Sequence, residues 1–235
     1  MQNHGQRQTV SSVWTATLLL SQSMSEDIEL VCRCGSIHGW ARGIAPNLVN
    51  RAVCYCDDCQ AFLHYLGRAD LLDAHAGTDI VQLPPNAIVY DRGAERIAGV
   101  RLTAKGMHRW YASCCKTPLG NTLTPVVAFI GMPLEVFRGA PDAERREAVF
   151  GKPRGFAGGK FAVGGTPEGL QKFPAVMFAG VILRVVSWKL RGRAWPHPYF
   201  EKASGGPSHP VTVLTARERD ALRPKCGPSP ISHTQ

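Results

Sequence analysis

Apolar and polar residues alternate through the first half of the chain in the way that short β-strands do. Residues 28–43 (IELVCRCGSIHGWARG) predict a strand, a tight turn that carries two cysteines, and a returning strand. Further strands, separated by Pro and Gly turns, are predicted within residues 77–93 and 96–115, and residues 124–137 predict one more strand pair. The first half is therefore mostly β, with each cysteine group at a strand end or a turn.

Three other segments carry helical patterns. Residues 50–67 predict a strand that ends at cysteines, followed by a short helix (DDCQAFLHYLG) that a glycine ends. Residues 141–151 (PDAERREAVFG) predict a charged helix. The longest candidate lies within residues 169–195, where an apolar stretch interrupted by Arg184 precedes a basic end. The glycine-rich residues 151–169 predict an ordinary loop, and the C-terminal end predicts an irregular tail.

These elements predict a mainly β fold with a C-terminal extension that contains one longer helix. Three regions are expected: a disordered extension over residues 1–23, with Met24 as an alternative start, a β domain over 24–135, and a basic, partly helical region over 136–235 packed on it. Residues 1–135 carry 11 Lys and Arg against 11 Asp and Glu, and residues 136–235 carry 16 against 7. The basic region is thus a candidate surface for nucleic acid, acidic protein or an anionic membrane.

Composition excludes several classes of protein. Hydrophobic residues make up 44% of the 235 positions and five are Trp, which argues for a folded core rather than disorder. No segment approaches the ~20 apolar residues that a membrane-spanning helix needs. The short apolar stretch near the N-terminus lacks the basic start and the cleavage site of a secretory signal. A reducing, cytoplasmic compartment is therefore expected, and disulfides are not.

Cysteines carry the most informative pattern in the chain. Seven of the eight fall in three groups: Cys32 and Cys34, then Cys54, Cys56 and Cys59, then Cys114 and Cys115. Pairs this close in sequence bridge poorly as disulfides, and clustering at strand ends is not a packing pattern. Metal binding remains, and thiolate ligands favour zinc, whereas the spacing does not favour an iron–sulfur cluster. Seven thiols fit one complete four-cysteine site and one three-cysteine site with an open position, the arrangement that separates a structural from a catalytic ion.

The succession CRCG, CYCDDCQ and CCKTPLG resembles the Gfa-like family, which includes glutathione-dependent formaldehyde-activating enzymes and relatives of centromere protein V. The resemblance covers about residues 28–123. It implies an Mss4-like fold of β-sheets pinned by two zinc ions, one structural and one that a thiol–aldehyde adduct such as S-hydroxymethylglutathione approaches. The implied structural ligands are Cys32, Cys34 and Cys115, and the implied catalytic zinc ligands are Cys54, Cys56 and Cys59.

The late motif departs from the family pattern C-x-x-C-G-T. Aligning CKTPL on it puts the first cysteine at Ala112, which cannot bind a metal, and Lys116 replaces the usual glycine. Cys114 is the obvious substitute, although adjacent cysteines reach one ion only through an unusual turn. Either Cys114 and Cys115 both bind, or one binds and another ligand completes the set.

Other residues could assist chemistry at a zinc ion with an open coordination position, but the sequence identifies them less specifically than it does the cysteines. Asp57, Asp58 and His64 follow the cysteines closely, but acidic residues there also suit a helix N-terminus and a lone histidine suits packing. His38 and His108 have the same ordinary explanation. Arginines suited to bind substrate carboxylates are Arg51, Arg101 and Arg109.

Three functions therefore stand beside one another. The first is a carbon–sulfur lyase-like protein that acts on, or binds, a glutathione-like thiol adduct at the three-cysteine zinc. The second is a zinc-stabilised binding module whose basic C-terminal region engages nucleic acid, acidic protein or membrane. In the third, both zinc sites are structural and Cys114 completes the second one, which leaves no open position.

Overall fold

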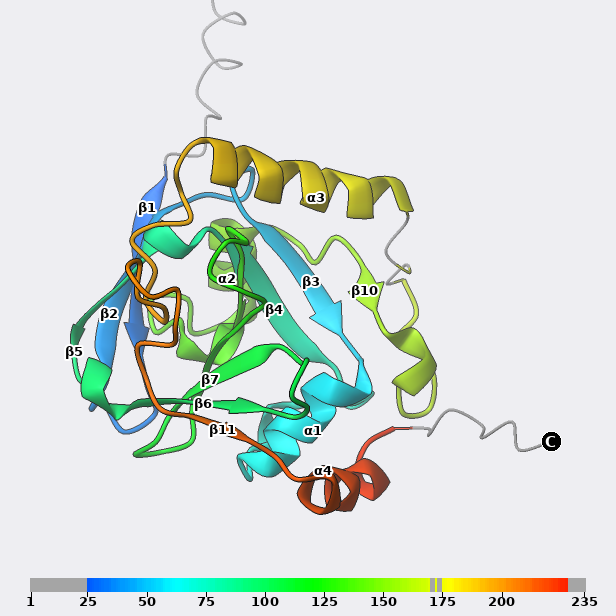
Figure 1. Cartoon of the computed structure of the whole chain (residues 1–235). Helices are drawn as coiled ribbons and strands as arrows, with labels where there is room; N and C mark the ends of the chain where they lie inside the picture. The colour runs from blue at the N-terminus through cyan, green and yellow to red at the C-terminus, as the bar shows by residue number, and fades with distance from the viewer. Residues whose placement is uncertain (1–24, 170–171, 173–174, 228–235) are drawn as a thin grey trace, which may run out of the picture.

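The computed structural model describes residues 25–169, 172 and 175–227 of the chain. These residues form eleven strands and four α-helices (Figure 1). The strands are β1 (Glu26–Val31), β2 (His38–Ile44), β3 (Asn50–Cys54), β4 (Thr78–Leu83), β5 (Ile88–Arg92), β6 (Ile97–Arg101), β7 (His108–Ala112), β8 (Pro118–Thr122), β9 (Ile130–Pro133), β10 (Phe156–Ala157) and β11 (Val211–Val213). The helices are α1 (Asp57–Tyr65), α2 (Ala143–Phe150), α3 (Ala175–Leu190) and α4 (Ala216–Leu222). The prediction of a mainly β fold with one longer helix is confirmed.

The strands are arranged in two sheets. A three-stranded antiparallel sheet has the order β1-β2-β5, and an eight-stranded sheet has the order β10-β3-β4-β9-β8-β7-β6-β11. The central seams of the larger sheet are antiparallel, whereas its two edge strands, β10 and β11, pair in parallel with β3 and β6. Both edge strands come from the chain beyond residue 136. The C-terminal part of the chain is therefore built into the same sheet as the cysteine-bearing strands.

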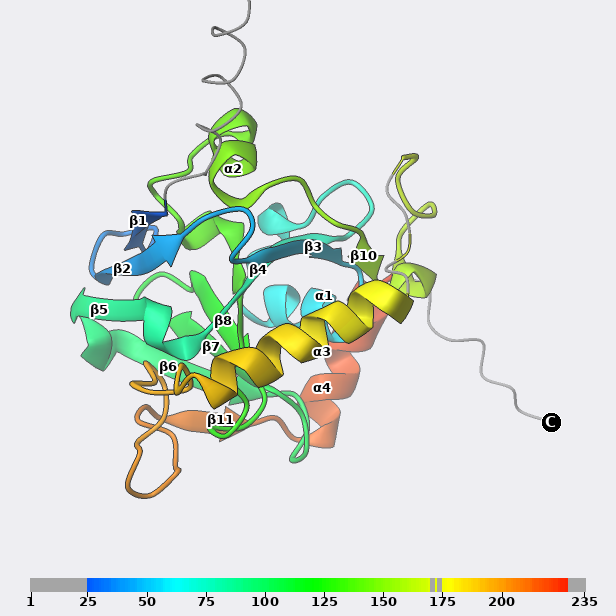
Figure 2. The same ribbon diagram turned by 90° about the horizontal axis from the view of Figure 1, so that it is seen from above.

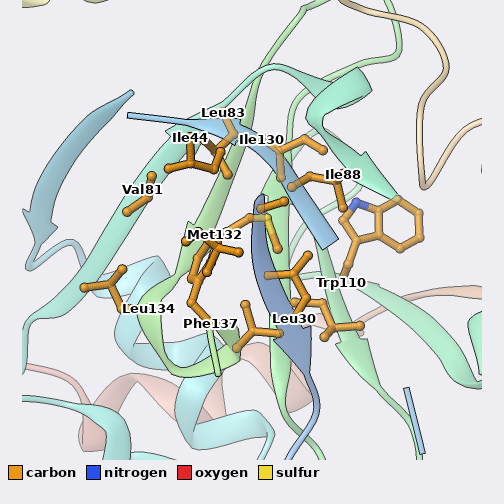
Figure 3. Close-up of a cluster of buried hydrophobic side chains, with 14 of the residues drawn as sticks. Leu30, Ile44, Val81, Leu83, Ile88, Trp110, Ile130, Met132, Leu134 and Phe137 are labelled. Carbon is orange, nitrogen blue, oxygen red and sulfur yellow. The ribbon is translucent and has the colours of Figure 1, made fainter. Parts of the chain in front are cut away.

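The main core lies between the two sheets and is formed by buried apolar side chains from strands of both. Figure 3 shows side chains from both sheets and from the segment after β9 pointing toward one another. The labelled members are Leu30, Ile44, Val81, Leu83, Ile88, Trp110, Ile130, Met132, Leu134 and Phe137. Trp110 is fully buried, and its indole Nε1–H donates to Thr122 Oγ1 at 2.8 Å, so the ring is packed without leaving its polar atom unpaired.

The helices cover separate parts of the large sheet. Helix α1 begins directly after Cys56 and ends before Gly67, which has the left-handed φ of 66° that glycine favours. Figures 1 and 2 show α4 beside α1 and α3 crossing the opposite side of the molecule, and Phe62 of α1 and Leu222 of α4 share a second apolar cluster. On α3, Trp188 packs against Ala128 and the chain after the helix.

Two predictions from the sequence are wrong, and a third concerns residues that the structure does not describe. Residues 124–137 form one strand, β9, rather than a pair, because a short 3-10 turn follows Pro133. The predicted irregular tail is wrong for residues 216–222, which form α4. The extension predicted for residues 1–23 lies outside the described residues. Within the described part of the chain, no helix is both long enough and apolar enough to cross a membrane.

Candidate metal centres

Four cysteines from two turns meet at one end of the small sheet. Cys32 and Cys34 lie in the turn between β1 and β2, and Cys114 and Cys115 lie in the turn between β7 and β8. All four sulfurs lie within 4.8 Å of one another. The distances are 3.6 Å for Cys32–Cys34, 3.4 Å for Cys34–Cys114 and 3.9 Å for Cys114–Cys115. Sulfurs at ~2.3 Å from a tetrahedral zinc lie about 3.8 Å apart, so this group can hold such an ion.

The first turn is closed by backbone hydrogen bonds that aim its sulfurs. Gly35, at a φ of 76°, donates its N–H to Cys32 O at 2.9 Å, and Ile37 donates its N–H to Cys32 Sγ at 3.2 Å. A backbone donor to a thiolate stabilises its negative charge. The side-chain and backbone hydrogen bonds of Ser36 lower the pKa of Cys34 to about 6. Burial, by contrast, raises the pKa of Cys32. Within this turn the metal-binding thiolate form is therefore favoured at Cys34.

The second turn brings adjacent cysteines to one point. Lys116 has a left-handed φ of 59° and donates its N–H to Ala112 O at 2.8 Å. Thr117 Oγ1 accepts from the N–H of Arg33 at 2.9 Å and lies 3.2 Å from Cys115 Sγ, which ties the two turns together. The structure thus places both Cys114 and Cys115 in the group, with Lys116 in the conformation that would suit the missing glycine.

Three further cysteines converge where β3 runs into α1. Cys54 ends β3, Cys56 is the N-terminal cap of α1, and Cys59 lies in its first turn. The sulfurs of Cys54 and Cys56 are 3.3 Å apart, and those of Cys54 and Cys59 are 3.5 Å apart. In the part of the chain that is described, no fourth cysteine, histidine or carboxylate joins this group. It can hold a metal ion through three thiolates, which leaves one tetrahedral position to another ligand.

A buried arginine lies against this three-cysteine group. Arg109 of β7 is 2% exposed and donates from Nη1 to Cys59 Sγ at 3.7 Å and to Asn121 Oδ1 at 3.3 Å. Hydrogen bonds with Cys54 and Cys56, together with the positive charge of Arg109, hold the pKa of the Cys59 thiol well below its usual range. A zinc ion held by three thiolates would carry a formal charge of about −1, which the guanidinium of Arg109 would offset.

A cavity of about 270 Å³ opens beside the three-cysteine group. Strands β3, β4, β7, β8 and β9, together with α1 and α3, contribute to its walls. Most of the lining is apolar, and the polar side chains are Asp58, Gln82, Arg109 and Asn121, besides the cysteines themselves. A ligand in this cavity would therefore lie in contact with the open side of the group.

The other residues singled out in the sequence fall into different roles. Of the three arginines, Arg109 lies at the cavity, whereas Arg51 pairs with Asp79 at 2.7 Å and Arg101 donates to Gly106 O. His38 lies between Asp91 and Glu29 on the small sheet, and His108 stacks on Trp110.

The two acidic candidates at the start of α1 bind the C-terminal part of the chain. Asp57 forms an ion pair with Arg223, and Asp58 pairs with the same guanidinium at 3.1 Å. Asp58 also lies 3.8 Å from Arg109 Nη2 and lines the cavity. His64 lies in the last turn of α1 and is not among the residues that line it.

The sequence patterns did not predict the roles of two further residues near the three-cysteine group, Asn121 and Gln60. Asn121 orients Arg109, and Gln60 is fully buried and bonds to the backbone on both sides of α1. Gln60 directly follows the last cysteine of CYCDDCQ. Its place on the buried face of a short helix is the feature that could have indicated a structural role.

Comparison with known proteins places the chain in a family. Residues 24–211 match a family described as Family of unknown function (DUF6151). The chain belongs to this family. The match of the DUF6151 chain includes both cysteine groups and all of the sheet strands up to β11, so it spans the neutral and the basic halves of the sequence. No curated protein matches the chain.

Proposed function

We propose that this DUF6151 chain is a zinc protein with two different sites. The four-cysteine group would hold a structural ion, and the group of Cys54, Cys56 and Cys59 would hold an ion with an exchangeable fourth position. The observation that carries the proposal is the convergence of only three sulfurs beside a cavity of about 270 Å³. The resemblance of the cysteine spacing to the Gfa-like family, with its Mss4-like fold, supports the same division of roles.

The reaction class that suits such a site is carbon–sulfur lyase-like chemistry on a thiol–aldehyde adduct, of which S-hydroxymethylglutathione is an example. A zinc ion on three thiolates would supply a soft Lewis acid that favours a fourth sulfur ligand. In the release direction, the carbon–sulfur bond breaks with its electron pair remaining on sulfur. The hydroxyl O–H electron pair forms the aldehyde C=O bond, and the proton passes to a base.

Two side chains of the cavity fit the needs of that step. The guanidinium of Arg109 is fixed by Asn121 and Cys59, so it can stabilise negative charge that develops on sulfur without moving. Asp58 lines the same cavity and is held by Arg223, and its carboxylate would receive the hydroxyl proton.

The test measures exchange of formaldehyde between its free and thiol-bound forms by NMR, with zinc-loaded protein and a series of thiols. We expect the wild-type protein to accelerate exchange for at least one thiol. Asp58→Asn should reduce the acceleration by about 100-fold, the usual contribution of a positioned acid or base. Exchange at the rate of the buffer control for every thiol would reject the lyase-like activity.

A second function is favoured by the outer face of α3. Four large apolar side chains on this face, Ile182, Leu183, Val186 and Leu190, are between 46% and 83% exposed. Lys189, in the last turn of α3, and Arg191, directly after the helix, are also exposed. An exposed apolar stripe with adjacent cations complements the interface of an anionic bilayer, whereas nucleic acid favours basic rather than apolar faces. We propose that α3 lies on anionic membrane surfaces.

Vesicle sedimentation tests this proposal directly. The full chain should bind vesicles that contain phosphatidylserine and bind phosphatidylcholine vesicles much more weakly. The double variant Ile182→Glu and Leu183→Glu should lose binding, and Val213→Glu, an exposed apolar site on β11, should retain it. Equal sedimentation of all variants would reject a membrane role for α3. If no protein sediments with vesicles and the double variant converts a dimer to a monomer, the exposed face serves self-association instead.

A further inference from the structure

The cavity beside Cys54, Cys56 and Cys59 has walls of a definite chemical character. Its apolar lining includes Ile80 of β4, Met107 and Phe129 from loops next to the sheet, and Phe178 and Val181 from α3. These residues come from separate parts of the sequence and contact the same cavity. A site built for a charged peptide would instead present several unpaired polar side chains to its ligand.

The one cation and the side-chain amide oxygens of the described lining are already engaged by the protein. Arg109 is shared among Cys59 Sγ, Asn121 Oδ1 and Asp58, and its guanidinium lies 5.6 Å from the centre of the Phe62 ring. Gln82 Oε1 accepts from Asn50 Nδ2 at 2.9 Å. Among the described residues that line the cavity, Arg109 is the one cation. A ligand that carries carboxylates would therefore bring charges that this lining does not neutralise.

Glutathione is such a ligand, since it carries two carboxylates and one ammonium group around its thiol. Placing an unpaired charge against apolar walls is costly, whereas burying hydrocarbon there is favourable by about 25 cal/mol per Å². An apolar thiol satisfies both requirements at once. Its sulfur would reach the three-cysteine group, and its hydrocarbon would cover the walls formed by β4, the neighbouring loops and α3.

We infer that this cavity selects an alkyl or aryl thiol, and the aldehyde adduct of that thiol, over glutathione. The inference rests on the proposed function, because it needs an exchangeable position on an ion held by Cys54, Cys56 and Cys59. It goes beyond that function by assigning the substrate class, and it makes α3 part of the binding site. Phe178 and Val181 are the α3 residues that contact the ligand in this arrangement.

The experiment uses the full chain loaded with cobalt(II) in place of zinc, because a thiolate that joins the ion changes its visible absorption. The protein is titrated with 2-phenylethanethiol and, separately, with glutathione. The inference predicts that 2-phenylethanethiol binds at least tenfold more tightly. Comparable or tighter binding of glutathione, with the absorption change, would overturn the inference and leave the proposed function standing. No absorption change with either thiol would overturn the proposed function and the inference with it.

Two variants with equal exposure locate the bound thiol. Phe178 lines the cavity and Val126 does not, and both are 60% exposed, so an aspartate at either position is compatible with folding. Phe178→Asp should weaken binding of 2-phenylethanethiol by about tenfold with the cobalt content unchanged, and Val126→Asp should leave binding at the wild-type value. Equal effects of the two substitutions would place the thiol outside the cavity and reject the inference.

Discussion

The left-handed backbone conformation of one residue, Lys116, allows the adjacent Cys114 and Cys115 to join the same cysteine group. A C-x-x-C spacing would put the first cysteine at Ala112, but this residue is buried within β7 and pairs with Ile97 of β6. The adjacent cysteines reach one point because the chain turns back at Lys116, with a left-handed φ of 59°. The sequence indicates which residue types are available, but it does not reveal that turn, since lysine rarely adopts this conformation.

A comparison of two variants at Lys116 tests this interpretation. Lys116→Ala and Lys116→Gly both remove the contact between Lys116 Nζ and the Tyr111 ring, which lie 5.1 Å apart. Glycine alone also relieves the left-handed strain, so we expect a free energy of unfolding about 1 kcal/mol higher for the glycine variant than for the alanine variant. Urea denaturation of the metal-loaded proteins measures the difference. Equal stabilities would mean that the turn stores no strain.

The alternation of apolar and polar residues predicted most of the strands. Strands and helices whose sequences lack such a pattern were not predicted. Strand β8 has the sequence PLGNT, where Pro and Gly suggest a turn, yet all five residues are buried between β7 and β9. Its strand character comes from its neighbours in the sheet rather than from its own propensity. Helix α4 did carry a local signal, since Thr215 and Glu218 form a capping box that the sequence displays as T-x-x-E.

The packing of α1 depends on one buried amide. Gln60 donates from Nε2 to Tyr55 O at 2.7 Å and to Phe161 O at 2.9 Å, and its Oε1 accepts from the N–H of Gly227. This side chain joins α1, the helix that carries Cys59, to two distant parts of the chain. Sequence patterns do not predict such a link, because its partners lie 101 and 167 residues away.

Gln60→Leu keeps the approximate volume and leaves these three backbone groups without partners. Each unpaired buried group costs about 1–3 kcal/mol, and with partial relaxation we expect the free energy of unfolding to fall by about 2–4 kcal/mol. Thr215→Ala, which removes an exposed helix cap, provides a reference of about 1 kcal/mol. Denaturant midpoints measured with saturating zinc give both values. A smaller loss for Gln60→Leu than for Thr215→Ala would contradict the assigned role.

The distribution of charge divides the sequence into a neutral region before residue 136 and a basic region after it. The large sheet of the folded molecule contains strands from both regions. The edge strands β10 and β11 flank strands from the first half, and their positions depend on pairings across more than a hundred residues. Local composition does not contain that information. The group of Cys54, Cys56 and Cys59 lies within six residues, so its spacing alone indicated it. The meeting of Cys32 and Cys34 with Cys114 and Cys115 joins turns 80 residues apart, and only the resemblance to the Gfa-like family implied that grouping.

The buried histidine His197 makes the stability of the fold depend on pH. His197 is 8% exposed, its Nδ1 accepts from the Tyr199 N–H, and burial lowers its pKa to about 4 from the usual value of 6.5. Because the unfolded chain binds the proton more strongly, the stabilising contribution of neutral His197 is present above pH 6.5. It is lost progressively as the pH falls toward 4.

His197→Phe should remove this part of the pH dependence. From the two pKa values we expect the wild type to lose about 2 kcal/mol more stability than the variant between pH 7 and pH 5. Thiolate protonation affects both proteins alike, so the difference between their urea denaturation curves isolates the histidine. Parallel losses of stability in the two proteins would show that His197 is protonated in the folded state as readily as in the unfolded chain.

We propose two separable metal sites in the chain, one closed by four cysteines and one held by three. Elemental analysis of protein purified without added metal tests it, with the triple variant Cys54→Ser, Cys56→Ser and Cys59→Ser beside the wild type. We expect two zinc ions per chain in the wild type and one in the variant, with circular dichroism unchanged. A wild type without bound metal, or a triple variant that loses all metal and its fold, would contradict it.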